Sequence, residues 1–94
     1  MEITHVRVFP VNKGDLKAYA IIIVDRSLVI RDVKVICGPK GYYFVGMPSR
    51  KQAKGGFFEI VSPVTARARK LLQERVLDEY ERVTGEAVTR RKRK

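Results

Sequence analysis

The sequence has few of the residues from which disulfides, metal sites and most active sites are built. Its single cysteine, Cys37, excludes an internal disulfide and is too few for a cysteine-based zinc site, which needs four ligands. We therefore expect Cys37 to act as a small apolar residue at the end of a strand. The single histidine, His5, is accompanied by no motif that ties an acid or a nucleophile to it. We therefore expect no enzymatic activity, no metal, no cofactor and no small-molecule substrate.

Long apolar runs are also absent. No stretch reaches the roughly 18 apolar residues that a membrane span requires. Residues 1–5 show no basic leader followed by an apolar block, so no secretory signal is visible. We expect a cytoplasmic protein that has no membrane partner.

Acidic residues are scarce relative to basic ones. The chain has 10 Asp and Glu against 20 Lys and Arg, a formal net charge of +10. A surface this basic favours polyanions, with nucleic acid as the first candidate and anionic membranes or acidic proteins as the second. Residues 48–56 hold three basic and no acidic residues, and residues 84–94 hold five basic and one acidic residue. The excess is therefore concentrated in a central loop and at the C-terminal end.

The first part of the chain has the pattern of β-strands separated by turns. Predicted strands span residues 2–9, 17–25, 28–37, 42–47 and 57–61. The turns between the first four are short and contain Gly, Asn, Asp or Pro, which predicts an antiparallel sheet. Gly46 inside the fourth strand is typical of a β-bulge.

One helix is predicted to follow the strands. Ser62 has the position of an N-cap, Pro63 that of the first helical residue, and Gly85 that of a C-terminal stop. Leu77 is predicted to point away from the apolar stripe that packs on the sheet. That stripe consists of Val64, Ala68, Leu72, Val76, Tyr80 and Val83, with Leu71 at its edge.

These elements predict an α+β fold, a small antiparallel β-sheet of four to five strands with one C-terminal α-helix. Residues 1–85 are expected to form a single domain, and residues 86–94 a basic, disordered tail. Residues 19–24 are apolar on both faces of their strand, yet a single helix covers only one side of a sheet. The simplest remedy is a second copy that covers the other side or extends the sheet, so we expect a homodimer formed through the sheet.

The charges of the predicted helix oppose its dipole. Residues 62–72 contain Arg67, Arg69 and Lys70 and no acid, whereas residues 73–83 contain four acids. A helix favours acids in its first turn and bases in its last. An anion would explain the reversal, because free N–H groups, the positive dipole end and three cations would converge on a phosphate.

An ordinary solvated helix is the alternative explanation of these charges. Lys70 with Glu74, and Arg75 with Glu79, have the spacing of weak ion pairs along a helix. The acids of the second half would in either case repel a duplex backbone. The helix is therefore expected to present its N-terminal end, and not to lie full length in a groove.

The central basic loop, residues 49–56, is the second candidate contact. It carries Arg50, Lys51 and Lys54 without an acid, and its glycines allow a ligand to approach closely, although a soluble exposed loop would have the same composition. Four aromatic residues flank the loop and would stack on unpaired bases where they are exposed. At least half of them are expected in the core, so the pattern does not predict a stacking platform. They are Tyr42, Tyr43, Phe57 and Phe58.

Residues 43–51, YFVGMPSRK, resemble the F-V-[AG]-M-P-S-[KR]-[KR] core of the stage V sporulation protein G family, also called septation proteins. Residues 2–7, 30–36 and 76–80 and the proline at 63 match as well, so the resemblance covers about residues 1–85. It implies a dimeric bacterial regulator of gene expression that binds DNA, and in some members RNA, with roles in septum formation and sporulation. The basic pair of the family core falls on Arg50 and Lys51, and helix-start residues linked to nucleic-acid preference fall on residues 65–70.

The sequence thus predicts a nucleic-acid-binding regulatory protein without an active site. Two other interpretations remain open at this stage: an RNA- or ribosome-associated accessory protein, and an adaptor that grips an acidic protein partner. The nucleic-acid-binding residues are predicted to be Arg50, Lys51, Lys54, Arg67, Arg69 and Lys70.

Overall fold

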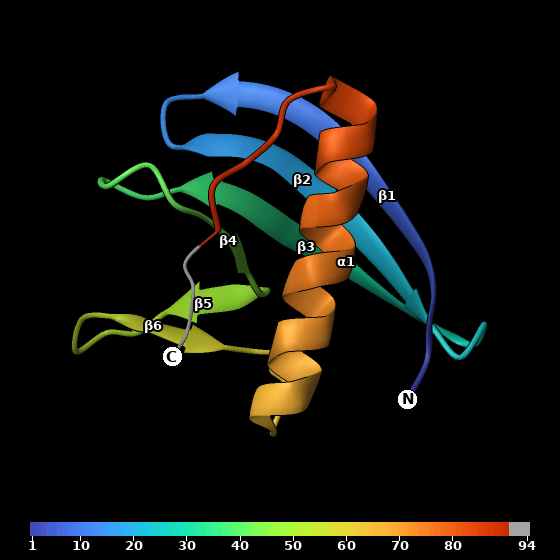
Figure 1. Ribbon diagram of the computed structural model, residues 1–94. Coiled ribbons are helices and arrows are strands. Elements are labelled where there is room, and N and C mark those ends of the chain that lie inside the picture. Colours follow the sequence, from blue (N-terminus) through green and yellow to red (C-terminus); the bar gives the residue numbers. More distant parts are fainter. Residues whose placement is uncertain (91–94) are drawn as a thin grey trace.

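The computed structural model describes residues 1–90 and contains one four-stranded sheet, one two-stranded hairpin and one helix (Figure 1). The predicted α+β architecture is confirmed. The four-stranded sheet is antiparallel with the order β1-β2-β3-β4, and β5 pairs with β6 in the separate hairpin. The elements are β1 (Ile3–Lys13), β2 (Leu16–Val24), β3 (Leu28–Cys37), β4 (Tyr43–Gly46), β5 (Ser49–Lys51), β6 (Phe57–Glu59) and α1 (Ala66–Thr84).

The turn between β2 and β3 shows how the local sequence sets the strand pairing. Asp25 and Arg26 have φ angles of 52° and 54°, and the Ser27 N–H donates to the Val24 carbonyl at 2.9 Å. Two consecutive residues with positive φ define the type I′ turn, whose twist matches that of two antiparallel strands. The Asp25 carboxylate also accepts the Glu2 N–H at 2.7 Å, which ties β1 to the same end of the sheet.

Helix α1 lies across one face of the four-stranded sheet and closes the core there (Figure 1). From the sheet, Ala18, Ala20 and Ile22 of β2 and Val33 and Val35 of β3 are fully buried. The face opposite the helix stays open. The core on the helix side consists of Leu72, Val76, Leu77 and Tyr80.

The predicted helix stripe was wrong at several positions. Leu77 is fully buried, whereas Val64 is 94% exposed and lies outside the helix. Each step of four residues turns a helix about 40° past a full turn, so a row of such steps drifts off the buried face. Leu72, Val76 and Tyr80 of the predicted stripe are buried, and Leu77 shares their face because it lies three residues before Tyr80.

The helix also begins later than predicted. Thr65 is the N-cap, with extended backbone angles and a hydroxyl that accepts the Ala68 N–H at 3.0 Å, so the assignment of Ser62 and Pro63 was wrong. Residues 60 and 61, just before Ser62, are held next to the base of the hairpin, because their N–H groups donate to the Pro48 carbonyl at 2.8 and 3.5 Å. The predicted end is confirmed, since Gly85 is the C-cap with a φ of 74°.

Two expectations about β4 and the basic loop need correction. The pairing of β3 with β4 runs without a register shift, so Gly46 is not at a bulge. A Cβ atom at this position would lie 3.1 Å from the Ile36 Cδ1 atom, which explains the small residue by close packing. The predicted loop of residues 49–56 begins with β5, and the predicted strand at 57–61 is the shorter β6.

The burial of Leu77 can be tested against another leucine of the same helix. We expect Leu77→Ala to lower the free energy of unfolding by about 2–5 kcal/mol, because it leaves a cavity in the core. Leu71→Ala changes helix propensity equally but removes a side chain that is 38% exposed, and should cost less than about 1 kcal/mol. Urea denaturation measures both losses. Equal losses would contradict the described packing.

Candidate nucleic-acid interface

The β5–β6 hairpin places the central cations on two faces. Arg50 lies opposite Phe58 in the ladder, and Lys51 lies opposite Phe57. Opposed residues of two paired strands share a face, and successive residues alternate between faces. Arg50 and Phe58 therefore occupy one face of the hairpin, whereas Lys51, Phe57 and Glu59 occupy the other.

Lys54 lies in the turn of the hairpin, at the end away from Glu59. The turn is closed by two backbone hydrogen bonds, from the Gln52 N–H to the Gly56 carbonyl at 3.0 Å and from the Gly55 N–H to the Gln52 carbonyl at 3.1 Å. Gly55 and Gly56 have φ angles of 95° and 76°, which other residues rarely adopt. The basic segment is thus a built hairpin whose three cations are all exposed.

The helix start lies against the base of this hairpin through a single ion pair. The Arg69 guanidinium donates to the two carboxylate oxygens of Glu59 at 3.1 and 3.5 Å. The partner of Arg69 is thus supplied by β6 and not by the helix. Neither Lys70–Glu74 nor Arg75–Glu79 is among the ion pairs of residues 1–90, and Arg75 instead donates to the Ile3 carbonyl at 2.7 Å.

The six predicted cations come from two elements, the hairpin and the helix start. Glu59 pairs with Ser49, so Arg69 lies one ladder position from Arg50 at the hairpin base. Arg67 precedes Arg69 by two residues, which is about 200° around a helix, and so faces away from that contact. A hairpin group (Arg50, Lys51 and Lys54) and a helix-start group (Arg67 and Lys70) are therefore joined by the Arg69–Glu59 pair.

The helix start retains the electrostatic character that the sequence predicted. Its first turn contains no acidic residue, and Thr65 caps one amide group through its hydroxyl. The Arg67 and Lys70 side chains are exposed, and neither is part of an ion pair within residues 1–90. The positive end of the helix dipole and two cations therefore face solvent together.

The chain is similar to a known family of proteins over most of its length. The SpoVG family model matches residues 1–82, which include both sheets and nearly all of α1. The chain belongs to the SpoVG family. The resemblance of the core segment is thereby confirmed.

Several SpoVG proteins whose names refer to septation match most of the chain. The one from Anaeromyxobacter sp. strain K is 46% identical over 82 residues, covering 87% of this chain and 80% of the relative. The one from Treponema denticola is 48% identical over 83 residues, covering 87% and 88%. The one from Clostridium novyi is 40% identical over 87 residues, covering 92% and 86%.

In this SpoVG family member the helix is followed by a segment that folds back onto the sheet. Residues 86–90 leave the end of α1 and return to β4, where the Tyr43 N–H donates to the Thr89 carbonyl at 2.8 Å. Val88 packs against the core. The expectation of a disordered tail was therefore wrong for residues 86–90, and residues 91–94 lie outside the described residues.

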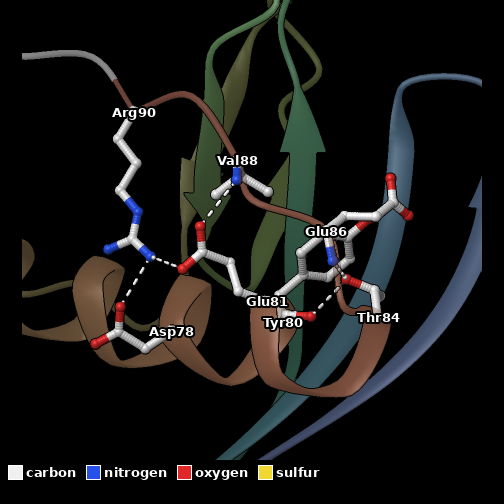
Figure 2. A network of polar contacts seen from close by, with 7 residues as sticks. All are labelled: Asp78, Tyr80, Glu81, Thr84, Glu86, Val88 and Arg90. Atoms are coloured by element: carbon white, nitrogen blue, oxygen red, sulfur yellow. Dashed lines mark hydrogen bonds and ion pairs between the residues drawn. The ribbon is translucent and has the colours of Figure 1, made fainter.

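The acids of α1 hold this returning segment. The Arg90 guanidinium contacts Asp78 at 2.8 Å and Glu81 at 3.0 Å, and Glu81 also accepts the Val88 N–H at 2.8 Å (Figure 2). The acid-rich half of the helix thus binds Arg90, the one basic residue of residues 86–90, and the Val88 amide. Its charges serve the fold, while the cations of the first half remain on the surface.

The resolved pKa shifts of this SpoVG protein also belong to the second half of α1. Burial raises the pKa of Tyr80 to about 12, and its ring centroid lies 5.7 Å from that of Tyr43. The hydrogen bond from Arg82 lowers the pKa of Glu79, and the same bond raises the pKa of Arg82. These shifts follow from the burial of Tyr80 and from the Glu79–Arg82 ion pair. No cluster of His, Cys, Asp or Glu in residues 1–90 has the arrangement of a metal site.

Phe57 and Phe58 were named from the sequence as aromatics flanking the basic loop but were not included among the predicted site residues. Phe57 is 75% exposed and Phe58 is 54% exposed. Neighbouring residues of a strand point to opposite faces, and a hairpin with no third strand gives both faces to solvent. The two adjacent aromatic residues in so short a strand were the sequence feature that could have indicated their exposure.

In the described part of the chain, the helix is not both long and apolar enough to cross a membrane.

The returning segment can be tested by amide hydrogen exchange. We expect Glu81→Ala to speed exchange at the Tyr43 and Val88 amides about fivefold, because it removes the acceptor that holds Val88 and Arg90. Glu74→Ala, at an exposed carboxylate with no ion pair in residues 1–90, should leave both amides unchanged. Unaltered exchange at Tyr43 in the Glu81 variant would show that the segment is held by other contacts.

Proposed function

We propose that this SpoVG family member is a nucleic-acid-binding regulatory protein of bacterial gene expression that acts in the cytoplasm on DNA and also on RNA. The observation that carries the proposal is the exposed hairpin group beside a helix start that lacks acids. Because the names of the relatives refer to septation, we place the regulated genes in septation and cell division, with sporulation control in species that form spores.

The charge balance of residues 49–73 supports phosphate as the ligand. This segment contains six cations and one acid, and the one acid, Glu59, is paired with Arg69. Five cations are left to neutralise an external polyanion. Contacts of this kind position a protein on a nucleic-acid backbone and add affinity that is independent of sequence.

Two copies of the chain would place two such surfaces on one nucleic acid. The face opposite α1 exposes Phe9, Tyr19, Val29 and Phe44, each between 37% and 43% exposed. Arg7 lies 5.3 Å from the Phe9 ring centroid on this face, and Lys34 lies 6.0 Å from that of Tyr19. A homodimer that packs these faces together would bury apolar surface that a single helix cannot cover.

The salt dependence of binding tests the role of the hairpin cations. With five phosphates neutralised, log affinity for duplex DNA should fall against log salt with a slope of about −4.5. The double change Arg50→Ala and Lys51→Ala should weaken binding and flatten that slope to about −2.7. Arg31→Ala with Lys40→Ala removes the same charges from exposed positions elsewhere and should change the slope little. Identical slopes in the two variants would refute the assigned role.

RNA competition in the same assay separates two forms of the proposal. RNA that displaces duplex DNA at equal affinity supports a regulator of both polymers. RNA that binds while duplex DNA does not would favour an RNA-associated protein.

The dimer is tested at the centre of the open face. Ile21 of β2 points away from α1, and Ile21→Glu would place a charge between the two apposed sheets. We expect the wild type to sediment as a dimer and this variant as a folded monomer. Val64→Glu adds the same charge at an exposed site outside that face and should leave the dimer intact. A monomeric wild type would overturn the arrangement.

A further inference from the structure

The hairpin presents its two phenylalanines in a way that core packing does not explain. Burying a phenylalanine stabilises a protein, yet Phe57 and Phe58 are among the most exposed large apolar residues of the described chain. They belong to opposite faces of β6, so no rearrangement against one surface of the body would bury both. Their exposure therefore calls for a ligand that reaches both faces.

Each ring lies across the ladder from a cation. Phe58 is opposite Arg50 and Phe57 is opposite Lys51, and side chains in such cross-strand positions are close neighbours. Residues 49–58 contain no acid. The space around the turn is open, since a Cβ atom at Gly55 or Gly56 would meet nothing within 4 Å. Each face thus offers one flat apolar surface beside one positive charge.

We propose that the β5–β6 hairpin binds unpaired nucleotides, with Phe57 and Phe58 each stacking on a base and with Lys51 and Arg50 holding the adjoining phosphates. Unpaired nucleotides combine flat π faces with regularly spaced negative charges, which is the complement of this surface. The bases of a duplex are already stacked on one another and offer no free face. A single strand bends across the edge of the hairpin and reaches both sides.

Two other occupants fit the hairpin less well. A membrane surface approaches from one side, and rings on opposite faces do not enter it together. A second copy of the hairpin would bring three further cations against the first three, and the one acid of the hairpin, Glu59, is already paired with Arg69. The proposal rests on the proposed function in one respect, namely that Arg50 and Lys51 contact phosphate.

The test compares single-stranded and duplex DNA of the same mixed sequence, about 20 nucleotides long, by fluorescence anisotropy with the full chain. We expect Phe57→Ala and Phe58→Ala each to weaken binding of the single strand about 5- to 100-fold, the range found for loss of one stacked base. Duplex binding should change less than about twofold, and the salt slope should not change, because no charge is lost. Tyr42→Ala, at an exposed aromatic outside the hairpin, should leave both affinities unchanged.

A direct spectroscopic reading comes from Phe58→Trp. The chain contains no tryptophan, so the new indole is the only one. Stacking on a base should quench its fluorescence on addition of the single strand, and this variant should retain the affinity that Phe58→Ala loses. Circular dichroism verifies that each variant is folded.

The outcomes separate this inference from the function on which it rests. If the double change Phe57→Ala with Phe58→Ala leaves single-strand binding unaffected while Arg50→Ala with Lys51→Ala abolishes it, the stacking is overturned and the proposed regulator stands. Absence of all nucleic-acid binding by the wild type overturns both. Loss of binding to vesicles of anionic phospholipid, or loss of the dimer, with single-strand affinity unchanged, would assign the rings to a membrane or to a second copy instead.

Discussion

The structure depends on one packing contact, a single helix laid on one face of a four-stranded sheet. Leu77 and Val76 belong to one buried core with the side chains of β2 and β3, and nothing in residues 1–90 covers the other face. The hairpin also lies beyond this layer, joined to it by the Pro48 carbonyl and the Arg69–Glu59 pair. The surfaces to which we assign binding are those that one helix leaves uncovered.

The same helix divides its charges between two tasks. Its second half holds acids that bind Arg90 and the Val88 amide, so they stabilise the fold from within. Its first half holds cations, of which only Arg69 meets an acid in residues 1–90. Acids near the C-terminal end of a helix and cations near its N-terminal end both oppose the helix dipole. In α1 this cost is offset by Arg90 at the C-terminal end and by solvent at the N-terminal end.

The antiparallel order of the first four strands followed from local sequence, because alternation and turn residues act over a few positions, whereas several strand limits did not. Residues 28–37 were placed without error, and Gly85 marked the helix end. The helix start was ambiguous in the sequence, since both Ser62 and Thr65 have a side chain that can cap a helix. The hydrogen bonds from residues 60 and 61 to the Pro48 carbonyl, which hold the chain just before Ser62, are not visible in the sequence. The Arg69–Glu59 and Arg90 contacts join residues distant in sequence, which no local pattern encodes. The candidate cations were therefore identified by type, while their division into two groups was not.

The return of residues 86–90 to β4 has a consequence for how copies of the chain assemble. An unpaired edge strand recruits further strands, and that addition repeats without limit toward fibrils. Here the backbone of Thr89 already occupies the Tyr43 amide at that edge. Addition of a further strand is therefore hindered at this edge of the sheet.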